Sequence, residues 1–434
     1  MSLKTKCKIF IKNKMVGSVV VYTFSAFLNS AVPFLILPLL TRYLSTDEYG
    51  IVSMFNATVG LITPFLSLGS SVAIQRKLVE RDKAGNKEFI FNSFILVFSA
   101  TFLMMLLFFM FKNNITHFTG IPRELLFYVV FMSLSTALVN CVCAVLQILE
   151  KPKEYAVYQN LCTILNLLLS LYLVVVLKLG VSGRIYGIVY SKLLFAFLGV
   201  LLIIKYVGIK PHIRISYLKD IFLHYGIPMI PTEVKSTVLT YTDRLFVTNM
   251  ISLGETGVYS VGNQFAMPIL LLAQAFNLAF LPWLYKKLEH DKDEEKIMIV
   301  RLTYAYFVVI IAIALVWTTI SKPLISFIVG KEYHGAEIYV FWLSMGYAFT
   351  GMHMMVVNYI YYYKKATSYA FVTTAVIILN VVLNYILINV FGSVGAAQAT
   401  MIADFLSFVF TWLLSMKISR MPWFNKNVFR KGEV

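Results

Sequence analysis

Four basic residues lie within or at the end of long apolar segments, where a charge needs a polar surrounding. Lys192, Lys235 and Arg244 are well inside these segments, and Arg42 is at the end of the first one. A charge at mid-membrane costs about 2.5–3.5 kcal/mol even on the most permissive scale. Ammonium and guanidinium groups bind phosphate, and guanidinium does so with two parallel hydrogen bonds. The sequence therefore predicts a wet, cation-lined cavity for an anionic ligand, with purely structural ion pairs as the alternative.

A helix over residues 232–248 carries a separate polar face. At about 100° per residue, its charged and hydroxyl side chains fall within about 160° of arc. These side chains are Thr232, Glu233, Ser236, Thr237, Thr240, Asp243, Arg244 and Thr248. Pro228 and Pro231 precede this face and are predicted to break the helix, because proline donates no backbone hydrogen bond. Broken helices at membrane depth are typical of transport sites.

Three carboxylates at membrane depth are candidates for coupling transport to an ion gradient. Glu233 and Asp243 share the polar face with the cations, and Asp404 is isolated in an apolar run. The structural alternative pairs Glu233 and Asp243 with nearby cations. For Asp404, it predicts ordinary hydrogen bonds in a packed interior.

The sequence shows no motif for covalent catalysis, a cofactor or a metal. It has no phosphate-binding glycine loop, no nucleophile elbow and no Cys/His spacing for a metal. The longest connections between apolar runs have about seventeen residues, too few for the extramembrane domain that a membrane glycosyltransferase usually carries. We therefore expect neither an enzyme nor a cofactor.

The composition predicts an all-α membrane protein. Hydrophobic residues make up 59% of the chain and charged residues 14%, against about 25% charged residues in soluble domains. Because lipid offers the backbone no hydrogen-bond partner, the apolar runs must be helices. Twelve spans are predicted, at 16–40, 50–73, 89–111, 125–149, 156–177, 184–206, 221–249, 257–284, 297–320, 338–363, 369–390 and 397–416.

Basic residues are distributed unequally between alternate connections. One set of connections, which includes both ends of the chain, carries 27 Lys and Arg residues, and the other carries 7. Positive residues favour the cytoplasmic side, so both termini are predicted to be cytoplasmic. The net charge of +17 is then an orientation signal with affinity for anionic membrane lipids. Its scatter over short segments argues against binding of nucleic acid.

The two halves of the sequence repeat in the same orientation. At an offset of 214, Lys151-x3-Tyr155-Ala156-x8-Leu165-Asn166 recurs as Lys365-x3-Tyr369-Ala370-x8-Leu379-Asn380. At an offset of 207, residues 47–53 resemble residues 254–260. Six spans per half give two parallel bundles related by an axis along the membrane normal. The predicted domains are residues 1–206, a cytoplasmic linker at 207–220, and residues 221–434 with a basic tail.

An ordered set of motifs resembles the polysaccharide (O-antigen, Wzx-type) flippases. The set consists of PFLILPLLTRYL at 33–44, YGIPMIP at 225–231, the pair Asp243-Arg244, GVYS at 257–260, and Asn380-x3-Asn384-Tyr385 followed by Gly392-x2-Gly395-Ala396-Ala397-x2-Thr400. The resemblance covers essentially the whole chain. It places the chain beside MATE-type drug exporters and lipid II flippases, whose two six-helix bundles form a V and work by alternating access.

The resemblance implies a substrate of undecaprenyl-pyrophosphate carrying an oligosaccharide for O-antigen, lipopolysaccharide or capsule synthesis. It implies a location in the bacterial cytoplasmic membrane, with a polysaccharide polymerase and glycosyltransferases as partners. The alternative is a cation-coupled multidrug exporter of the MATE type. Such an exporter needs a buried carboxylate in its N-terminal half, whereas Lys192 is the buried charge in spans 16–206. This contrast favours the flippase.

Overall fold

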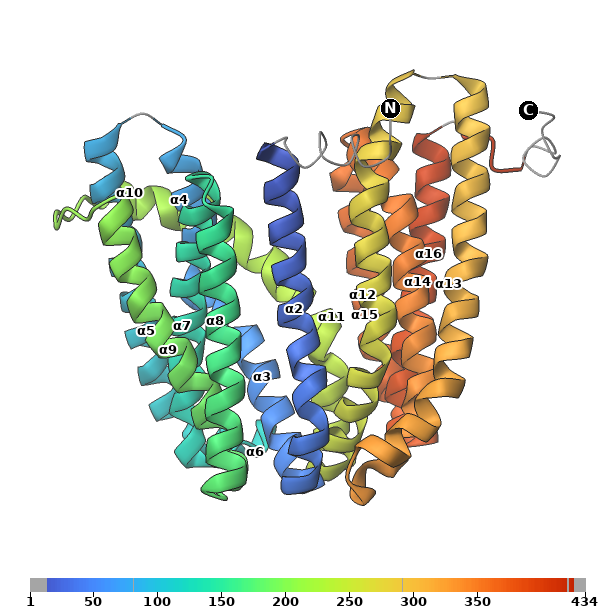
Figure 1. The fold of residues 1–434 in the computed structure, drawn as a ribbon, viewed down its shortest axis with the longest axis horizontal. Coiled ribbons are helices and arrows are strands. Elements are labelled where there is room, and N and C mark those ends of the chain that lie inside the picture. The colour runs from blue at the N-terminus through green and yellow to red at the C-terminus, as the bar shows by residue number, and fades with distance from the viewer. Residues whose placement is uncertain (1–13, 81, 291, 420, 425–434) are drawn as a thin grey trace, which may run out of the picture. The chain divides into compact units, whose positions relative to one another are not determined.

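The computed structural model describes residues 14–80, 82–290, 292–419 and 421–424, and every regular element in this part of the chain is a helix (Figure 1). The chain divides into two compact units, Met1–Tyr241 and Thr242–Val434. The division falls inside one helix, α11 (Ile227–Met250). The predicted domain limits at 206 and 220 stay a prediction.

The first unit contains the elements up to the first part of α11. They are α2 (Lys14–Tyr43), α3 (Thr46–Ser67), α4 (Ser70–Leu78), α5 (Lys83–Met110), α6 (Lys112–Thr119), α7 (Arg123–Ile148), α8 (Pro152–Leu171), η1 (Tyr172–Val176), α9 (Gly180–Tyr206), α10 (Ile215–Asp220) and η2 (Ile221–Gly226). The second unit contains the end of α11 and the remaining elements. They are α12 (Leu253–His290), α13 (Asp293–Ile328), η3 (Lys331–Ala336), α14 (Glu337–Tyr362), α15 (Ala366–Phe391) and α16 (Ser393–Ile418).

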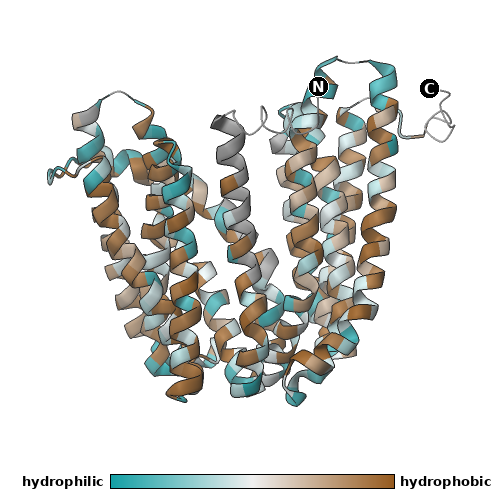
Figure 2. Cartoon of the chain, in the orientation of Figure 1, coloured by the Kyte–Doolittle hydropathy of each residue, from teal (hydrophilic) through white to brown (hydrophobic). Residues whose placement is uncertain are grey.

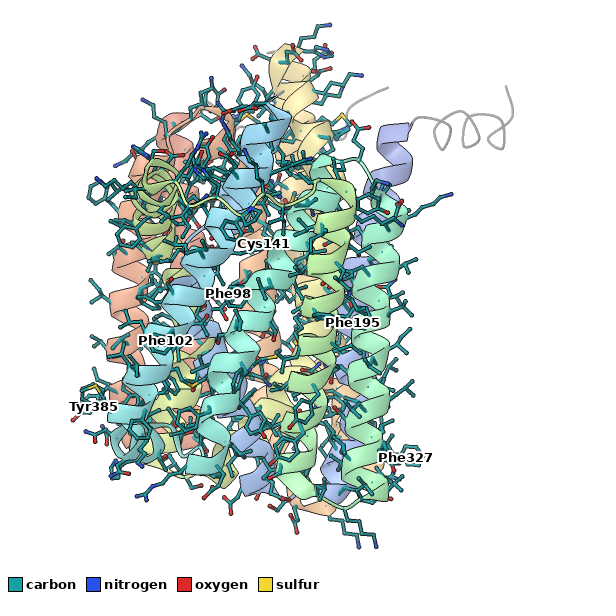
Figure 3. The ribbon with its side chains drawn as sticks, turned by 90° about the vertical axis from the view of Figure 1, so that its left-hand side faces the viewer. Phe98, Phe102, Cys141, Phe195, Phe327 and Tyr385 are labelled. Atoms are coloured by element: carbon teal, nitrogen blue, oxygen red, sulfur yellow. The ribbon has the colours of Figure 1, made fainter. Side chains whose placement is uncertain are left out.

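The helices have the length and surface of membrane spans. Among the described residues, ten helices are long and apolar enough to cross a membrane. Large side chains such as Phe102 and Phe327 are 67% and 83% exposed and lie on the outside of the helices (Figure 3). In Figure 2, hydrophobic residues cover the middle of most helices and hydrophilic residues gather toward their ends. The all-α membrane fold is confirmed, and the observed helices are consistent with twelve spans.

The predicted span at 50–73 is interrupted. Helix α3 ends at Ser67, and Leu68 and Gly69 both have positive φ, 44° and 65°. A Cβ on Gly69 would lie 3.0 Å from the backbone oxygen of Tyr225. The close approach of the η2 backbone therefore favours glycine here, and α4 begins at Ser70 after this interruption.

The helices pack in the same order in both units. Helix α7 packs against α3 and α9, and α8 packs on α9. In the second unit, α14 packs against α12 and α16, and α15 packs on α16. This correspondence agrees with the parallel repeat in the sequence.

The basic segment before α10 is attached to the start of α5. The buried carboxylate of Glu88 accepts a hydrogen bond from Lys210 Nζ at 2.6 Å and forms an ion pair with Arg214 Nε at 2.8 Å. The backbone N–H of Arg214 donates to Asn92 Oδ1 at 2.9 Å. These bonds explain why the predicted linker belongs to the first compact unit.

Equivalent glutamates connect two helix starts in each unit. Ser45 and Glu48 form a capping box at α3, and Glu48 Oε1 also accepts from Val181 N at the start of α9, at 3.0 Å. In the second unit, Glu255 N donates to Ser252 Oγ at 3.1 Å, and Glu255 Oε1 accepts from Ser393 Oγ at 2.8 Å. Glu48 caps its own helix, and both glutamates bind the start of the last spanning helix of their unit.

Candidate functional site

A buried acid–base cluster lies in the second unit, where α11 meets α12. Asp243 and Arg244 are 7% and 8% exposed, although both are charged residue types. The hydroxyl of Tyr259, which is fully buried, donates to Asp243 Oδ2, and Arg244 N donates to Asp243 Oδ1 at 2.8 Å. Buried charges are tolerated only when they are paired and hydrogen-bonded. The part of the predicted polar face that carries Asp243 and Arg244 is therefore directed at polar partners within the protein.

The cluster continues into α14 and α16. Tyr347 of α14 donates to Asn263 Oδ1 at 2.7 Å and is within electrostatic reach of Asp243, Arg244 and Asp404. Asp404 is hydrogen-bonded to Thr350. We call these seven residues the Asp243 cluster: Asp243, Arg244, Tyr259, Asn263, Tyr347, Thr350 and Asp404.

Asp404 lies near the middle of its helix. It is eleven residues after Ser393 in the 26-residue helix α16, so about 17 Å along an axis that rises 1.5 Å per residue. A Cβ on Gly346 of α14 would lie 3.0 Å from Asp404 Oδ2. The absence of a side chain at Gly346 lets the carboxylate lie directly against α14. The cluster thus contains two carboxylates and one guanidinium. Binding of a cation or an anion there would change its net charge.

Lys192 contributes a positive charge to the interior of the first unit. It is half-buried on α9 and interacts electrostatically with Cys143 of α7 and Cys162 of α8. Cys143 Sγ also accepts from Gln159 Nε2 at 2.8 Å. Lys192 thus faces neighbouring helices of its own unit.

Polar side chains continue from this point to α2. The hydroxyl of Thr163 donates to Asn29 Oδ1, and Asn29 Nδ2 donates to Asn160 Oδ1 at 3.4 Å. Helices α2 and α8 therefore meet through amide and hydroxyl groups. Such contacts are typical of helices that associate inside a membrane.

The other predicted site residues lie in different surroundings. Arg42 is exposed in the last turn of α2. Glu233 is half-buried and hydrogen-bonded to Ser67 of α3. The side chain of Lys235 lies outside the described residues. Among the predicted residues, the structure brings together Asp243, Arg244 and Asp404.

The predicted helix break at Pro228 and Pro231 takes a different form. Helix α11 starts at Ile227 and continues through both prolines, and the irregular segment is the π-helix η2 just before them. Proline removes a donor from the i→i−4 ladder. A π-helical turn shifts the hydrogen bonds by one residue and keeps the segment helical. The predicted break is therefore wrong: the helix changes from α to π type over residues 221–226 and is not interrupted.

Several site residues could not be recognised from the sequence. Arg184 donates to Ser170 Oγ at 2.6 Å and to Asn166 Oδ1 at 3.1 Å; in the sequence it is only one of the seven basic residues of the less basic set of connections. The repeated motif that contains Asn166 was the available signal. Tyr259 and Tyr347 gave none, because tyrosines in apolar runs also occur as ordinary core or interface residues. Within the described ranges, no group of three or more His, Cys, Asp or Glu is placed to bind a metal.

Comparisons with known proteins identify the family of the chain. A family model described as "Polysaccharide biosynthesis protein" matches residues 15–287. Lsg locus protein 1 of Haemophilus influenzae is 23% identical over 80% of this chain and 84% of its own length. A membrane protein of Methanocaldococcus jannaschii is 23% identical over 87% of this chain and 92% of its own length.

Two solved structures share the fold. The lipid II flippase MurJ in an inward closed conformation superposes with a TM-score of 0.73 at 17% identity, over 93% of this chain and 87% of that one. An inward-facing MATE family multidrug resistance transporter of the MOP superfamily gives 0.67 at 15% identity, over 93% and 96%. The multi-pass fold is thus that of two kinds of transporter.

Proposed function

We propose, from the premise that the chain belongs to the polysaccharide biosynthesis protein family, that it carries undecaprenyl-pyrophosphate-linked oligosaccharide repeat units across the bacterial cytoplasmic membrane. The units would serve O-antigen or capsular polysaccharide synthesis. Glycosyltransferases would supply them, and a polymerase would use them on the other side. In this proposal both termini are cytoplasmic, because the basic connections are on their side of the membrane.

One observation carries the proposal: each unit holds a buried or half-buried cation among polar groups inside otherwise apolar helices. Lys192 is half-buried among α7, α8 and α9, and Arg244 is buried among α11, α12 and α14. Retaining these charges at membrane depth is costly unless they serve a ligand or a partner. A pyrophosphate is the part of the proposed substrate that such cations attract.

The proposed cycle needs no covalent step by the protein. A ligand shifts an equilibrium between two conformations only by its different affinity for each of them. Cations that contact the pyrophosphate better in one conformation supply that difference. We therefore propose a transporter that is not an enzyme and is driven by the substrate gradient or by an ion, not by ATP.

A cation-coupled multidrug exporter is the second candidate. The Asp243 cluster favours it, because two buried carboxylates near one guanidinium are suited to exchange a proton or a cation. Against it, the spans between residues 16 and 206 carry no Asp or Glu at mid-membrane. The carboxylates of the cluster also fit a flippase whose movement is coupled to an ion.

The test is surface display of polysaccharide by the native bacterium from which the gene has been deleted. The wild-type gene should restore display, and Arg244→Ala should not, at similar protein level and unfolding temperature. Lys112→Ala is the matched control, because Lys112 is an exposed cation at a helix end. Normal display without the wild-type gene, together with loss of resistance to cationic drugs, would favour the exporter.

A further inference from the structure

The first unit has an apolar groove between α8 and α9 that the transport proposal does not use. Its volume is about 550 Å³, within the roughly 300–1,000 Å³ typical of sites for small ligands. Side chains of both helices line it, and Lys153, near the start of α8, and Lys205, near the end of α9, are among them.

The floor of the groove is built from one pair of aromatic side chains that contact each other. The hydroxyl of Tyr158 donates to the backbone oxygen of Phe195 at 2.7 Å, and the two rings meet edge to face with centroids 5.5 Å apart. A Cβ on Gly199 would lie 2.5 Å from the Tyr158 hydroxyl, so glycine is needed for this approach. Phe195 lies on the face of the unit shown in Figure 3.

The walls are aliphatic and open to the surroundings. Val157 and Leu161 of α8 are 57% and 49% exposed, and Leu198 and Leu201 of α9 are 40% and 46% exposed. Exposed aliphatic side chains on a membrane span face lipid chains. The ten residue steps from Phe195 to Lys205 cover about 15 Å at 1.5 Å per residue, which is half of the roughly 30 Å hydrocarbon core. The groove is therefore as deep as one leaflet.

The open end of the groove is positively charged. Lys153 and Lys205 line it and are both exposed. Its one acid, Glu154, is already paired with Lys151, whose Nζ is 3.3 Å from Glu154 Oε1. Lys151 also lies over the Tyr206 ring, 4.0 Å from its centroid. Three lysines thus surround one carboxylate where the hydrocarbon layer ends.

We propose that this groove binds one anionic glycerophospholipid, with an acyl chain between α8 and α9 and the phosphate between Lys153 and Lys205. The combination of an aliphatic trough one leaflet deep and cations at its end matches this class of lipid. A polyprenyl chain is several times longer than the trough, so most of it would remain outside. The site is distinct from the buried cations to which the transported pyrophosphate was assigned.

The experiment measures lipid binding to the purified full-length protein by native mass spectrometry, with dioleoylphosphatidylglycerol and dioleoylphosphatidylcholine as probes. Phosphatidylglycerol should bind more tightly. Each of Lys153→Gln and Lys205→Gln should weaken its binding about five-fold, and the double variant about twenty-five-fold, because each lysine near an anionic lipid contributes on the order of 1 kcal/mol. Leu161→Trp should fill the trough and abolish binding of this lipid.

Lys112→Gln and Lys178→Gln are the matched controls, since both lysines are exposed at helix ends away from the groove. They should leave binding unchanged, and unfolding temperatures identify any variant that does not fold. Equal binding of the two lipids, or unchanged binding in the Lys153/Lys205 double variant, would overturn the proposal. Displacement of phosphatidylglycerol by an equal concentration of undecaprenyl phosphate would also overturn it, by assigning the groove to the polyprenyl chain.

Discussion

The Asp243 cluster makes a quantitative prediction for the stability of the second unit. Asp243→Ala removes the acceptor of the fully buried Tyr259 hydroxyl and leaves Arg244, 8% exposed, without its neighbouring carboxylate. Removing one member of a buried charge pair costs about 3–5 kcal/mol, because the other charge stays buried. Asp243→Asn also removes the negative charge beside Arg244, but it keeps an acceptor for Tyr259, so it should cost about 1–3 kcal/mol less than Asp243→Ala.

The measurement is thermal unfolding of the purified protein in detergent. For a unit of this size, about 1 kcal/mol shifts the midpoint by roughly 2–4 °C. Asp243→Ala should therefore lower the unfolding temperature by about 10 °C and Asp243→Asn by about 5 °C. Asp293→Ala is the matched control, because the Asp293 side chain is 96% exposed in the same unit, and its midpoint should stay within about 1 °C.

A double-variant cycle tests the physical reason. If the cost comes from an uncompensated Arg244, the Asp243→Ala/Arg244→Ala variant should lose less than the sum of the two single variants, by at least about 1 kcal/mol. Additive losses, or a midpoint for Asp243→Ala close to that of the exposed control, would refute the assignment of a buried charge pair.

Three further predictions concern the first unit. Gly199→Ala should lower the unfolding temperature by an amount equivalent to about 1–3 kcal/mol through overpacking, since the new Cβ would lie 2.5 Å from the Tyr158 hydroxyl. Gly335→Ala is the control and should have little effect, because the atom nearest to its new Cβ would be 3.7 Å away. Glu48→Ala should lower the free energy of unfolding by about 1–2 kcal/mol through loss of capping. Glu48→Gln should lower it less, because the amide oxygen still accepts from the backbone. Equal losses in the two variants would exclude capping as the cause. Lys192→Glu should abolish polysaccharide display at normal protein level while Lys192→Arg retains it, and full display by Lys192→Glu would remove this residue from the site.

Hydropathy and charge predicted the fold because a membrane leaves the chain few choices. A spanning segment must satisfy its own backbone, so an apolar run of sufficient length is a helix. The interruption after Ser67 was not predictable from hydropathy, because it depends on the close approach of Tyr225 to Gly69, which are far apart in sequence. The π-helix before Pro228 was also not predicted, because the sequence argument treated proline only as a helix breaker.

The charged residues of the candidate site were predicted from the sequence, but their hydrogen-bonding partners were not. A charge in an apolar run is a visible anomaly, which is why Asp243, Arg244 and Asp404 could be selected from the sequence. Their tyrosine partners lie on other helices, and a tyrosine in an apolar run is not anomalous. Which charges lie near each other follows from packing, and a single sequence contains little information on the packing partners of a helix.

The central claim is tested most directly by flipping of a lipid-linked oligosaccharide in proteoliposomes that contain only the purified protein. The substrate carries a fluorophore on the sugar, and an impermeant reductant bleaches the molecules that reach the outer leaflet. Wild-type protein and Lys112→Ala should expose the inner-leaflet substrate, whereas Arg244→Ala should leave it protected, as in protein-free vesicles. The account would be contradicted if the wild-type protein exported a cationic dye, and so was active, but left the inner-leaflet substrate unbleached.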